Sequence, residues 1–159
     1  MTAMTLEPRG DREIVVVRAF NAPRDLVFEA FSRPELVKRW MLGPEGWSMP
    51  VCTIDFRAGG KGRYEWTSAD RQQGMALSAE FVEIVPPERI VHKEVFDGTP
   101  EPVEGLITST FVEKAGRTTL TMVIRYPTPE VRDFMLKSGM EHGMALSFER
   151  LETVVSKPT

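Results

Sequence analysis

Two histidines, His92 and His142, are the side chains of this sequence best suited to acid–base or metal chemistry. His92 stands in IVHKEVFD, two residues before Glu94, whereas His142 stands in GMEHGM near the C-terminus. A metal site needs several ligands at short, regular spacings, and these histidines lie on separate segments. We therefore expect no metal and no cofactor, and we assign no catalytic residue. His92 is kept as the candidate acid or base for any reaction.

Nucleophilic catalysis and phosphate binding find little support in the residue pattern. Cys52 is the only cysteine and alternates with Ile54 and Phe56, which is typical of a small buried side chain in a strand. The sequence contains no GxSxG motif. The glycine-rich run AGGKG (58–62) leads into a strand-like segment. It therefore predicts a hairpin corner, because a phosphate loop needs a helix behind it.

Large apolar side chains are concentrated in FEAFSRPELVKRWMLGPEGW (28–47), where they could fill a core or form the wall of a cavity. Phe28 and Phe31 have the spacing of a helix face that packs on a sheet. Trp40 and Trp47 flank MLGPEG, whose glycines and proline predict an exposed turn. An indole beside such a turn can line the mouth of a pocket. The sequence leaves both interpretations open for these tryptophans.

The surrounding segments predict the elements that would hold these side chains. Residues 12–20 are β-branched and predict a strand, and residues 22–32 and 34–41 predict two short helices. Apolar and polar residues then alternate, with predicted turns at Gly59-Gly60, Pro86-Pro87 and Ala115-Gly116. We expect about seven antiparallel strands in total.

The C-terminal part is predicted to be helical from about Pro129 to Val155, with a break at Ser138-Gly139, where the apolar stripe changes side. A sheet with one apolar face must bury that face, and this helix is the only predicted element long enough to cover it. The short helices would close one end. The space left between the helix and the curved sheet is the candidate binding site.

Composition limits the function classes. A length of 159 residues predicts a core that needs no disulfide or metal. A net charge of −3 with interleaved signs argues against nucleic-acid binding. No stretch is apolar enough for a signal peptide or a membrane span, so we expect a cytoplasmic protein that does not bind membranes. The expected organisation is a flexible segment at 1–12, one domain at 13–155 and a tail at 156–159.

Five segments together resemble a known family: FNAPRDLVFEAFSRPELVKRWMLGPEGW, IDFRAGGKGRYEW, FVEIVPPERIV, GRTTLTM and GMEHGMALSFERLETVV. They are similar, in this order, to the heat-shock-protein-90 ATPase activator homologues of the START-like superfamily. The resemblance implies an α+β helix-grip fold, in which a curved antiparallel sheet wraps a long C-terminal helix. Members include co-chaperones and ligand binders, so the fold alone does not decide the function.

The resemblance also implies which side chains face the helix. It places Tyr64 and Trp66 on the inner face of the sheet, and it places Ile90 in the core. By strand parity His92, Glu94 and Phe96 then share the side of Ile90. An inward Glu94 would mark a polar pocket floor, because a buried carboxylate is costly unless it is paired. The alternative is that Glu94 lies near the strand end in water.

We carry three functions forward. The preferred one is the binding of a small apolar or aromatic molecule under the terminal helix. The alternatives are a cyclase-, lyase- or hydrolase-type enzyme that uses His92 or Tyr64, and a module that acts on a chaperone ATPase. Exposed edge strands also leave a homodimer open. The predicted ligand-binding residues are Trp40, Trp47, Tyr64, Trp66, Met75, His92, Glu94, Phe96, Phe111, Met122, Met140, Met144 and Phe148.

Overall fold

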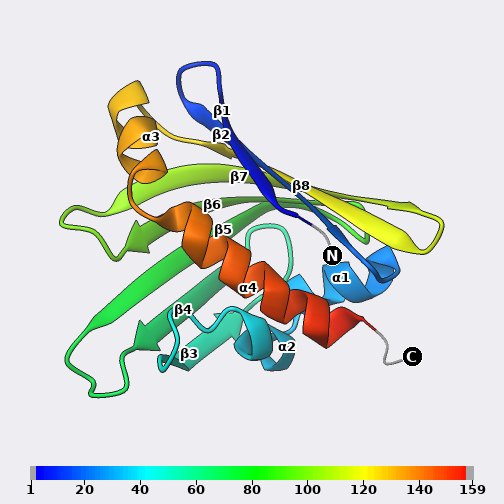
Figure 1. Cartoon of the computed structure of the whole chain (residues 1–159), viewed down its shortest axis with the longest axis horizontal. Coiled ribbons are helices and arrows are strands. Elements are labelled where there is room, and N and C mark those ends of the chain that lie inside the picture. The colour runs from blue at the N-terminus through cyan, green and yellow to red at the C-terminus, as the bar shows by residue number, and fades with distance from the viewer. Residues whose placement is uncertain (1–2, 157–159) are drawn as a thin grey trace.

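A curved antiparallel sheet forms the framework of the protein, and a long C-terminal helix lies across one of its faces (Figure 1). The computed structural model describes residues 3–156. The strands are β1 (Thr5–Arg9), β2 (Glu13–Phe20), β3 (Ser48–Ile54), β4 (Lys61–Thr67), β5 (Gly74–Val85), β6 (Arg89–Asp97), β7 (Val103–Lys114) and β8 (Arg117–Arg125). Their order across the sheet is β1-β2-β8-β7-β6-β5-β4-β3.

Four helices complete the described chain: α1 (Arg24–Ser32), α2 (Pro34–Trp40), α3 (Pro129–Leu136) and α4 (Met140–Val155). α1 and α2 follow β2, and α4 runs diagonally across the sheet from α3 towards α2 (Figure 1). The backbone of α4 comes closest to α2, α1, α3 and β2. This arrangement confirms the predicted helix-grip fold.

The N-terminal segment differs from the prediction. Residues 5–9, within the stretch expected to be flexible, form β1 and pair with β2, so the sheet has eight strands instead of about seven. The segment TLEPR is polar and contains Pro8, which hides the strand signal. Proline is tolerated here because β1 is an edge strand. Residues 1–2, and the predicted tail apart from Ser156, lie outside the described residues.

The break between the two C-terminal helices is confirmed. α3 ends at Leu136, and Gly139 takes a left-handed conformation with φ of 86° immediately before α4. Glycine adopts this conformation at little cost because it has no Cβ. The start of α3 is fixed by Thr128, whose side-chain oxygen accepts a hydrogen bond from the Val131 backbone N–H at 3.2 Å.

Strand parity divides the sheet into an inner face, towards α4, and an outer face. On β2, Ile14, Val16 and Phe20 are buried on the inner face, and the intervening side chains are partly exposed. Arg18 shares this inner face and is also buried, because it meets the C-terminal end of α4. The main hydrophobic core therefore lies between the inner face and the helices.

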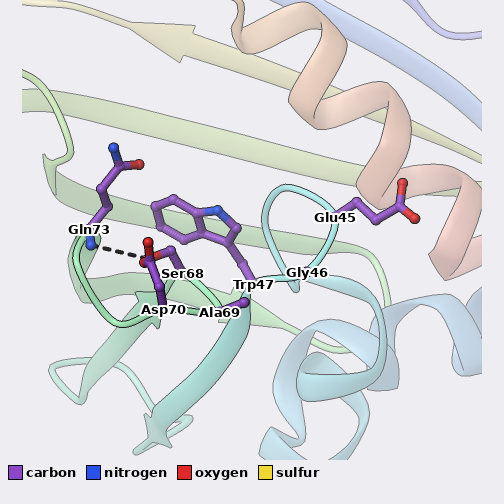
Figure 2. A pocket seen from close by; sticks show the side chains of 7 residues that line it. All are labelled: Glu45, Gly46, Trp47, Ser68, Ala69, Asp70 and Gln73. Atoms are coloured by element: carbon purple, nitrogen blue, oxygen red, sulfur yellow. Dashed lines mark hydrogen bonds between the residues drawn. The ribbon is translucent and has the colours of Figure 1, made fainter.

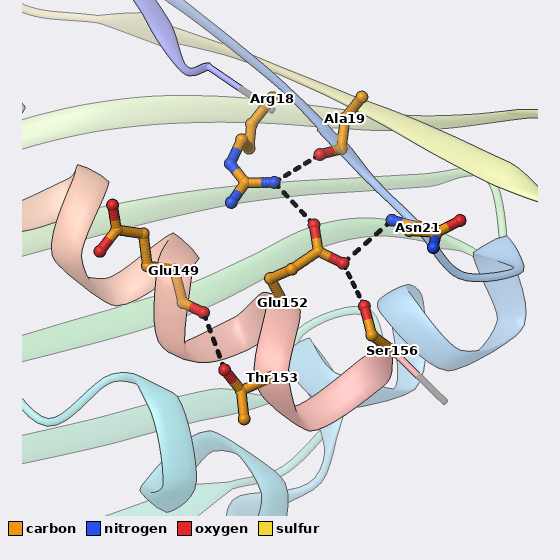
Figure 3. A network of polar contacts seen from close by, with 7 residues as sticks. All are labelled: Arg18, Ala19, Asn21, Glu149, Glu152, Thr153 and Ser156. Atoms are coloured by element: carbon orange, nitrogen blue, oxygen red, sulfur yellow. Dashed lines mark hydrogen bonds and ion pairs between the residues drawn. The ribbon is translucent and has the colours of Figure 1, made fainter. Parts of the chain in front are cut away.

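Polar contacts clamp the C-terminal end of α4 to β2 (Figure 3). Arg18 forms a 2.9 Å ion pair with Glu152, and the Asn21 backbone N–H donates to the same carboxylate at 3.1 Å. The Ser156 hydroxyl also donates to Glu152. Burial opposes ionisation of Glu152, but these hydrogen bonds together hold the pKa of its carboxyl below the usual value.

Candidate functional site

The inner face of the sheet is covered unevenly along α4. In the second half of α4, Phe148, Leu151 and Val155 are buried. In the first half, Met140 and Met144 are only partly buried, and His142 is exposed. The helix is therefore buried more completely near its C-terminal end than near its N-terminal end, where Met140 and Met144 pack against the main core but stay partly exposed.

An aromatic cluster fills the space at the tightly packed end. Phe31 lies edge-to-face against both Trp40 and Phe111, with ring centroids 4.8 and 5.5 Å apart. Phe148 from α4 approaches Trp40 with a centroid distance of 6.1 Å. Trp40 is only 1% exposed, and its indole N–H donates to the Ala30 carbonyl at 2.9 Å. Of the predicted ligand-binding residues, Trp40, Phe111 and Phe148 are thus placed in the core.

The other end of the inner face is more open. We call it the open end, and define it by the partly exposed inner-face and α4 residues Leu77, His92, Glu94, Phe96, Met140 and Met144. Ile90 is buried in the main core, so the residues of β6 on the same side, His92, Glu94 and Phe96, also face α4, as expected. The Glu94 side chain is 21% exposed, which places it at the border of the core and not in bulk water.

Small residues surround Glu94 on the neighbouring strands. In the sheet register Glu94 pairs with Ala79 of β5 on one side and with Gly105 of β7 on the other. Ala79 in turn pairs with Gly62 of β4. Side chains in one row across a sheet lie next to each other. None of these three positions therefore places a bulky side chain of its own beside the carboxylate, and the space above the two glycines is bordered by side chains of other rows.

Two buried tyrosines flank this row. A Cβ on Gly62 would lie 3.2 Å from the Tyr64 ring and hydroxyl. A Cβ on Gly105 would lie 3.6 Å from Ile107 and 3.7 Å from both Ile124 and the Tyr126 ring. Burial raises the pKa of Tyr64, with smaller contributions from Cys52 and Glu94. Burial, and then the charge of Glu94, raise the pKa of Tyr126. Both phenols therefore keep their protons at neutral pH.

His92 and Glu94 form a polar pair at the open end. The His92 Nε2 atom lies 3.3 Å from Glu94 Oε1, and the two side chains are 18% and 21% exposed. The His92 Nδ1 atom is buried and has no hydrogen-bond partner among the described residues. Phe81, which pairs with His92 across β5 and β6, packs against the imidazole with a centroid distance of 6.1 Å. This pair is the polar centre of an otherwise apolar surface.

The loop between α2 and β3 forms the rim of the open end. The Trp66 indole N–H donates to the Met41 carbonyl at 2.6 Å, and Arg150 of α4 donates to the Gly43 carbonyl at 2.8 Å. The Trp66 and Tyr64 rings stack with centroids 6.3 Å apart. The loop is thus tied to both the sheet and α4.

Two surface hollows lie near this rim. Figure 2 shows the first, of about 330 Å³, lined by Glu45, Gly46, Trp47, Ser68, Ala69, Asp70 and Gln73. The indole of Trp47 points over the β4–β5 hairpin, whereas Glu45 points away from it (Figure 2). The second hollow, of about 370 Å³, includes Trp66 and Met75 in its lining. The predicted residues Trp47 and Met75 therefore belong to the rim.

The remaining residues singled out in the sequence lie outside this site. Cys52 is buried, and burial raises the pKa of its thiol. Met122 on β8 pairs with Ser109 of β7, away from the row of Glu94 and Gly105. Within residues 3–156, no three His, Cys, Asp or Glu side chains are grouped closely enough to hold a metal ion. None of the helices in that range is long and apolar enough to cross a membrane.

Tyr126 and the small residues around Glu94 were missed from the sequence. Tyr126 follows the last residue of β8 and precedes Pro127, a context that marks only a strand end. Its position beside Gly105 depends on the pairing of β7 with β8. If the two predicted strands are paired residue by residue outward from the turn at Ala115-Gly116, Gly105 and Tyr126 fall opposite each other.

The fold and the inner face define a helix-grip protein of the START-like superfamily. The chain belongs to the family described as "Activator of Hsp90 ATPase homolog 1-like protein", whose profile matches residues 21–156. A search of curated proteins gave no match.

Solved structures from several bacteria share this fold. A protein from Rhodobacter sphaeroides is 27% identical with a TM-score of 0.86, and the match covers 94% of this chain and 95% of that one. A protein from Staphylococcus epidermidis is 29% identical with a TM-score of 0.76, over 96% and 93% of the two chains. A Mycobacterium smegmatis protein, 21% identical with a TM-score of 0.84 over 99% of both chains, shows likeness of fold alone.

Proposed function

We propose that the protein binds a small apolar or aromatic molecule between the open end of the inner face and the first half of α4. The observation that carries this proposal is the change in burial along α4: Phe148, Leu151 and Val155 are buried, whereas Met140 and Met144 are only partly buried. A molecule placed there would complete the cover of the inner face. Covering about 200 Å² of apolar ligand surface would contribute roughly 5 kcal/mol before the entropy costs of binding.

The residues at this end are suited to adjust to a guest. Met140 and Met144 have flexible side chains that adapt to irregular shapes. Both methionines are partly exposed, so their outer atoms are free to change conformation around a guest. The C-terminal clamp through Glu152 would hold the other end of the helix while the first half moves.

A ligand screen with a matched pair of variants tests the proposal. Small apolar and aromatic compounds should raise the melting temperature of the wild-type protein. At a concentration of about 100 Kd the gain is about 2.7 kcal/mol, or roughly 5–10 °C for a chain of this size. Gly105→Leu should reduce this shift, because the new side chain would extend from the position beside Glu94 towards the proposed site.

Val95→Leu is the control, since it adds bulk to the outer face of β6, where Val95 is exposed. It should keep the wild-type response. The proposal fails if no compound stabilises the wild-type protein, or if Gly105→Leu retains the full shift while remaining folded.

A second candidate is acid–base chemistry at the same place, which the 3.3 Å His92–Glu94 pair favours. The raised pKa of Tyr64 keeps its phenol protonated at neutral pH, so the base in such a reaction would be His92 or Glu94. Any turnover found with a ligand from the screen should fall strongly in His92→Ala. An unchanged rate in that variant would remove His92 from the mechanism.

A further inference from the structure

The polar centre of the open end has more hydrogen-bond acceptors than donors. Among the described residues, the hydrogen-bond partner of the Glu94 carboxylate is His92, which meets only Oε1. An ionised carboxylate can accept about four hydrogen bonds. Glu94 therefore lies at the border of the core, and the described residues use little of its accepting capacity.

His92 adds a further acceptor. If Nε2 donates to Glu94, the other nitrogen of the neutral ring has a lone pair and no hydrogen. That nitrogen, Nδ1, is buried without a partner in the part of the chain that the structure describes. A donor is therefore missing at the buried Nδ1 atom, and an unsatisfied buried polar group weakens a folded protein.

Apart from His92, which is charged only when protonated, the side chains that surround Glu94 in residues 3–156 bring no positive charge to it. Ala79 and Gly105 flank it in the sheet, and Tyr64 and Tyr126 contribute neutral phenols. The Tyr126 hydroxyl is 4.0 Å from the sulfur of Met140, on α4. The open end is therefore an apolar surface with a negatively charged floor.

Basic residues on the nearby elements are directed elsewhere. Lys93 and Arg89 alternate with Glu94 on β6 and belong to the outer face. Arg150 of α4 donates to the Gly43 carbonyl at the rim, and Arg18 is paired with Glu152 at the opposite end of α4. An anionic ligand would therefore meet the negatively charged carboxylate of Glu94 instead of a lysine or arginine.

We infer that the ligand presents a hydrogen-bond-donating, non-anionic group, an amine or a hydroxyl, to Glu94, while its apolar part lies under the first half of α4. This inference rests on the proposed function and specifies its ligand class. An amine gains both a charge-assisted hydrogen bond and Coulombic attraction. A hydroxyl gains the hydrogen bond alone, and a carboxylate or phosphate is repelled.

Three probes with the same apolar chain separate the head-group effect from the apolar effect. Decylamine, decanol and decanoate are titrated into the wild-type protein below their aggregation concentrations, and affinities are measured by calorimetry at pH 7. The expected order is amine, then alcohol, then carboxylate. The amine should bind about ten- to a hundredfold more tightly than the carboxylate, as expected for hydrogen bonds to a charged group.

Glu94→Gln should abolish most of the amine preference and improve decanoate binding, because it removes the negative charge and adds a donor. Glu104→Gln is the matched control, since Glu104 is exposed on the outer face of the adjacent strand β7. It makes the same change in net charge and should keep the wild-type order. A melting curve of each variant confirms that it is folded.

The outcomes distinguish the inference from the proposed function. Equal affinity for the three probes, tightest binding of decanoate, or an amine preference that survives in Glu94→Gln would each overturn the inference and leave apolar binding standing. If the wild-type protein binds none of the three probes, the proposed site itself fails, and the inference falls with it.

Discussion

Two substitutions on one face of α4 test the unequal packing on which the proposed site depends. Phe148 and Met144 are four residues apart, so their side chains lie one turn apart on the same side of the helix. Phe148 is buried and meets Phe20 edge-to-face with centroids 5.7 Å apart. Met144 is partly exposed. Phe148→Ala removes a large side chain from a fully buried position, whereas Met144→Ala removes one from a partly exposed position.

The expected costs differ several-fold. Phe148→Ala should lower the free energy of unfolding by about 3–5 kcal/mol, because it loses the transfer energy of the ring and leaves a cavity. Met144→Ala should cost about 1 kcal/mol or less, since part of its side chain is already in water and alanine is the better helix former. For a chain of this size each kcal/mol lowers the melting temperature by about 2–4 °C.

Urea denaturation of both variants, followed by circular dichroism, measures these values. The slopes of the transitions should match that of the wild-type protein, so that the difference in midpoint reports stability alone. Leu151→Ala, a further buried position on α4, should resemble Phe148→Ala. A loss in Met144→Ala as large as in Phe148→Ala would mean that α4 is packed equally along its length, and the case for a site at the open end would lose its basis.

Three further predictions concern the rest of the described chain. Because the pKa of Glu152 is lowered in the folded protein, its contribution to stability is present above its unfolded pKa and is lost as the pH falls through the folded pKa. The unfolding free energy of Glu152→Gln should therefore depend less on pH, on the acid side, than that of the wild-type protein. An identical acid-side dependence would contradict this. The Cys52 thiol should react slowly with iodoacetamide in the native protein and rapidly in urea, because burial raises its pKa and the thiolate is the nucleophile; fast native labelling would show that it is accessible. Gly139→Ala should destabilise the protein by about 1–2 kcal/mol, because the φ of Gly139 is positive. Gly143 lies within α4 with open space around it, so Gly143→Ala should stabilise the protein by up to about 1 kcal/mol. Equal effects of the two substitutions in denaturant titrations would refute the assignment of Gly139 as a helix boundary.

Local patterns were sufficient to predict most of the fold. The prolines at 23 and 34, the turn at Ala115-Gly116 and the break at Ser138-Gly139 all act through backbone conformations that neighbouring residues determine. β1 was missed because its strand state depends on pairing with β2 and not on its own composition. An isolated TLEPR segment has no apolar alternation to reveal it.

The site was harder to predict because it depends on distant packing. Strand parity correctly placed His92 and Glu94 on one face, since parity is a local property of β6. The same reasoning does not decide the place of Trp40, because one of its neighbours in the core, Phe148, comes from the far end of the chain. The neighbours of Glu94 come from β5 and β7, whose register the sequence alone did not specify.

The composition of α4 nevertheless accounts for the unequal cover of the inner face. Its first half, MEHGMALS, supplies a glycine and flexible methionines, whereas its second half, FERLETVV, supplies the three side chains that α4 buries. A helix packs closely only where large side chains fill the space beneath it. The clamp at Glu152 lies in the second half, so polar contacts and apolar packing fix the same end. The other end is therefore the part of α4 that can respond to a guest, and Glu94 lies on the sheet at that end.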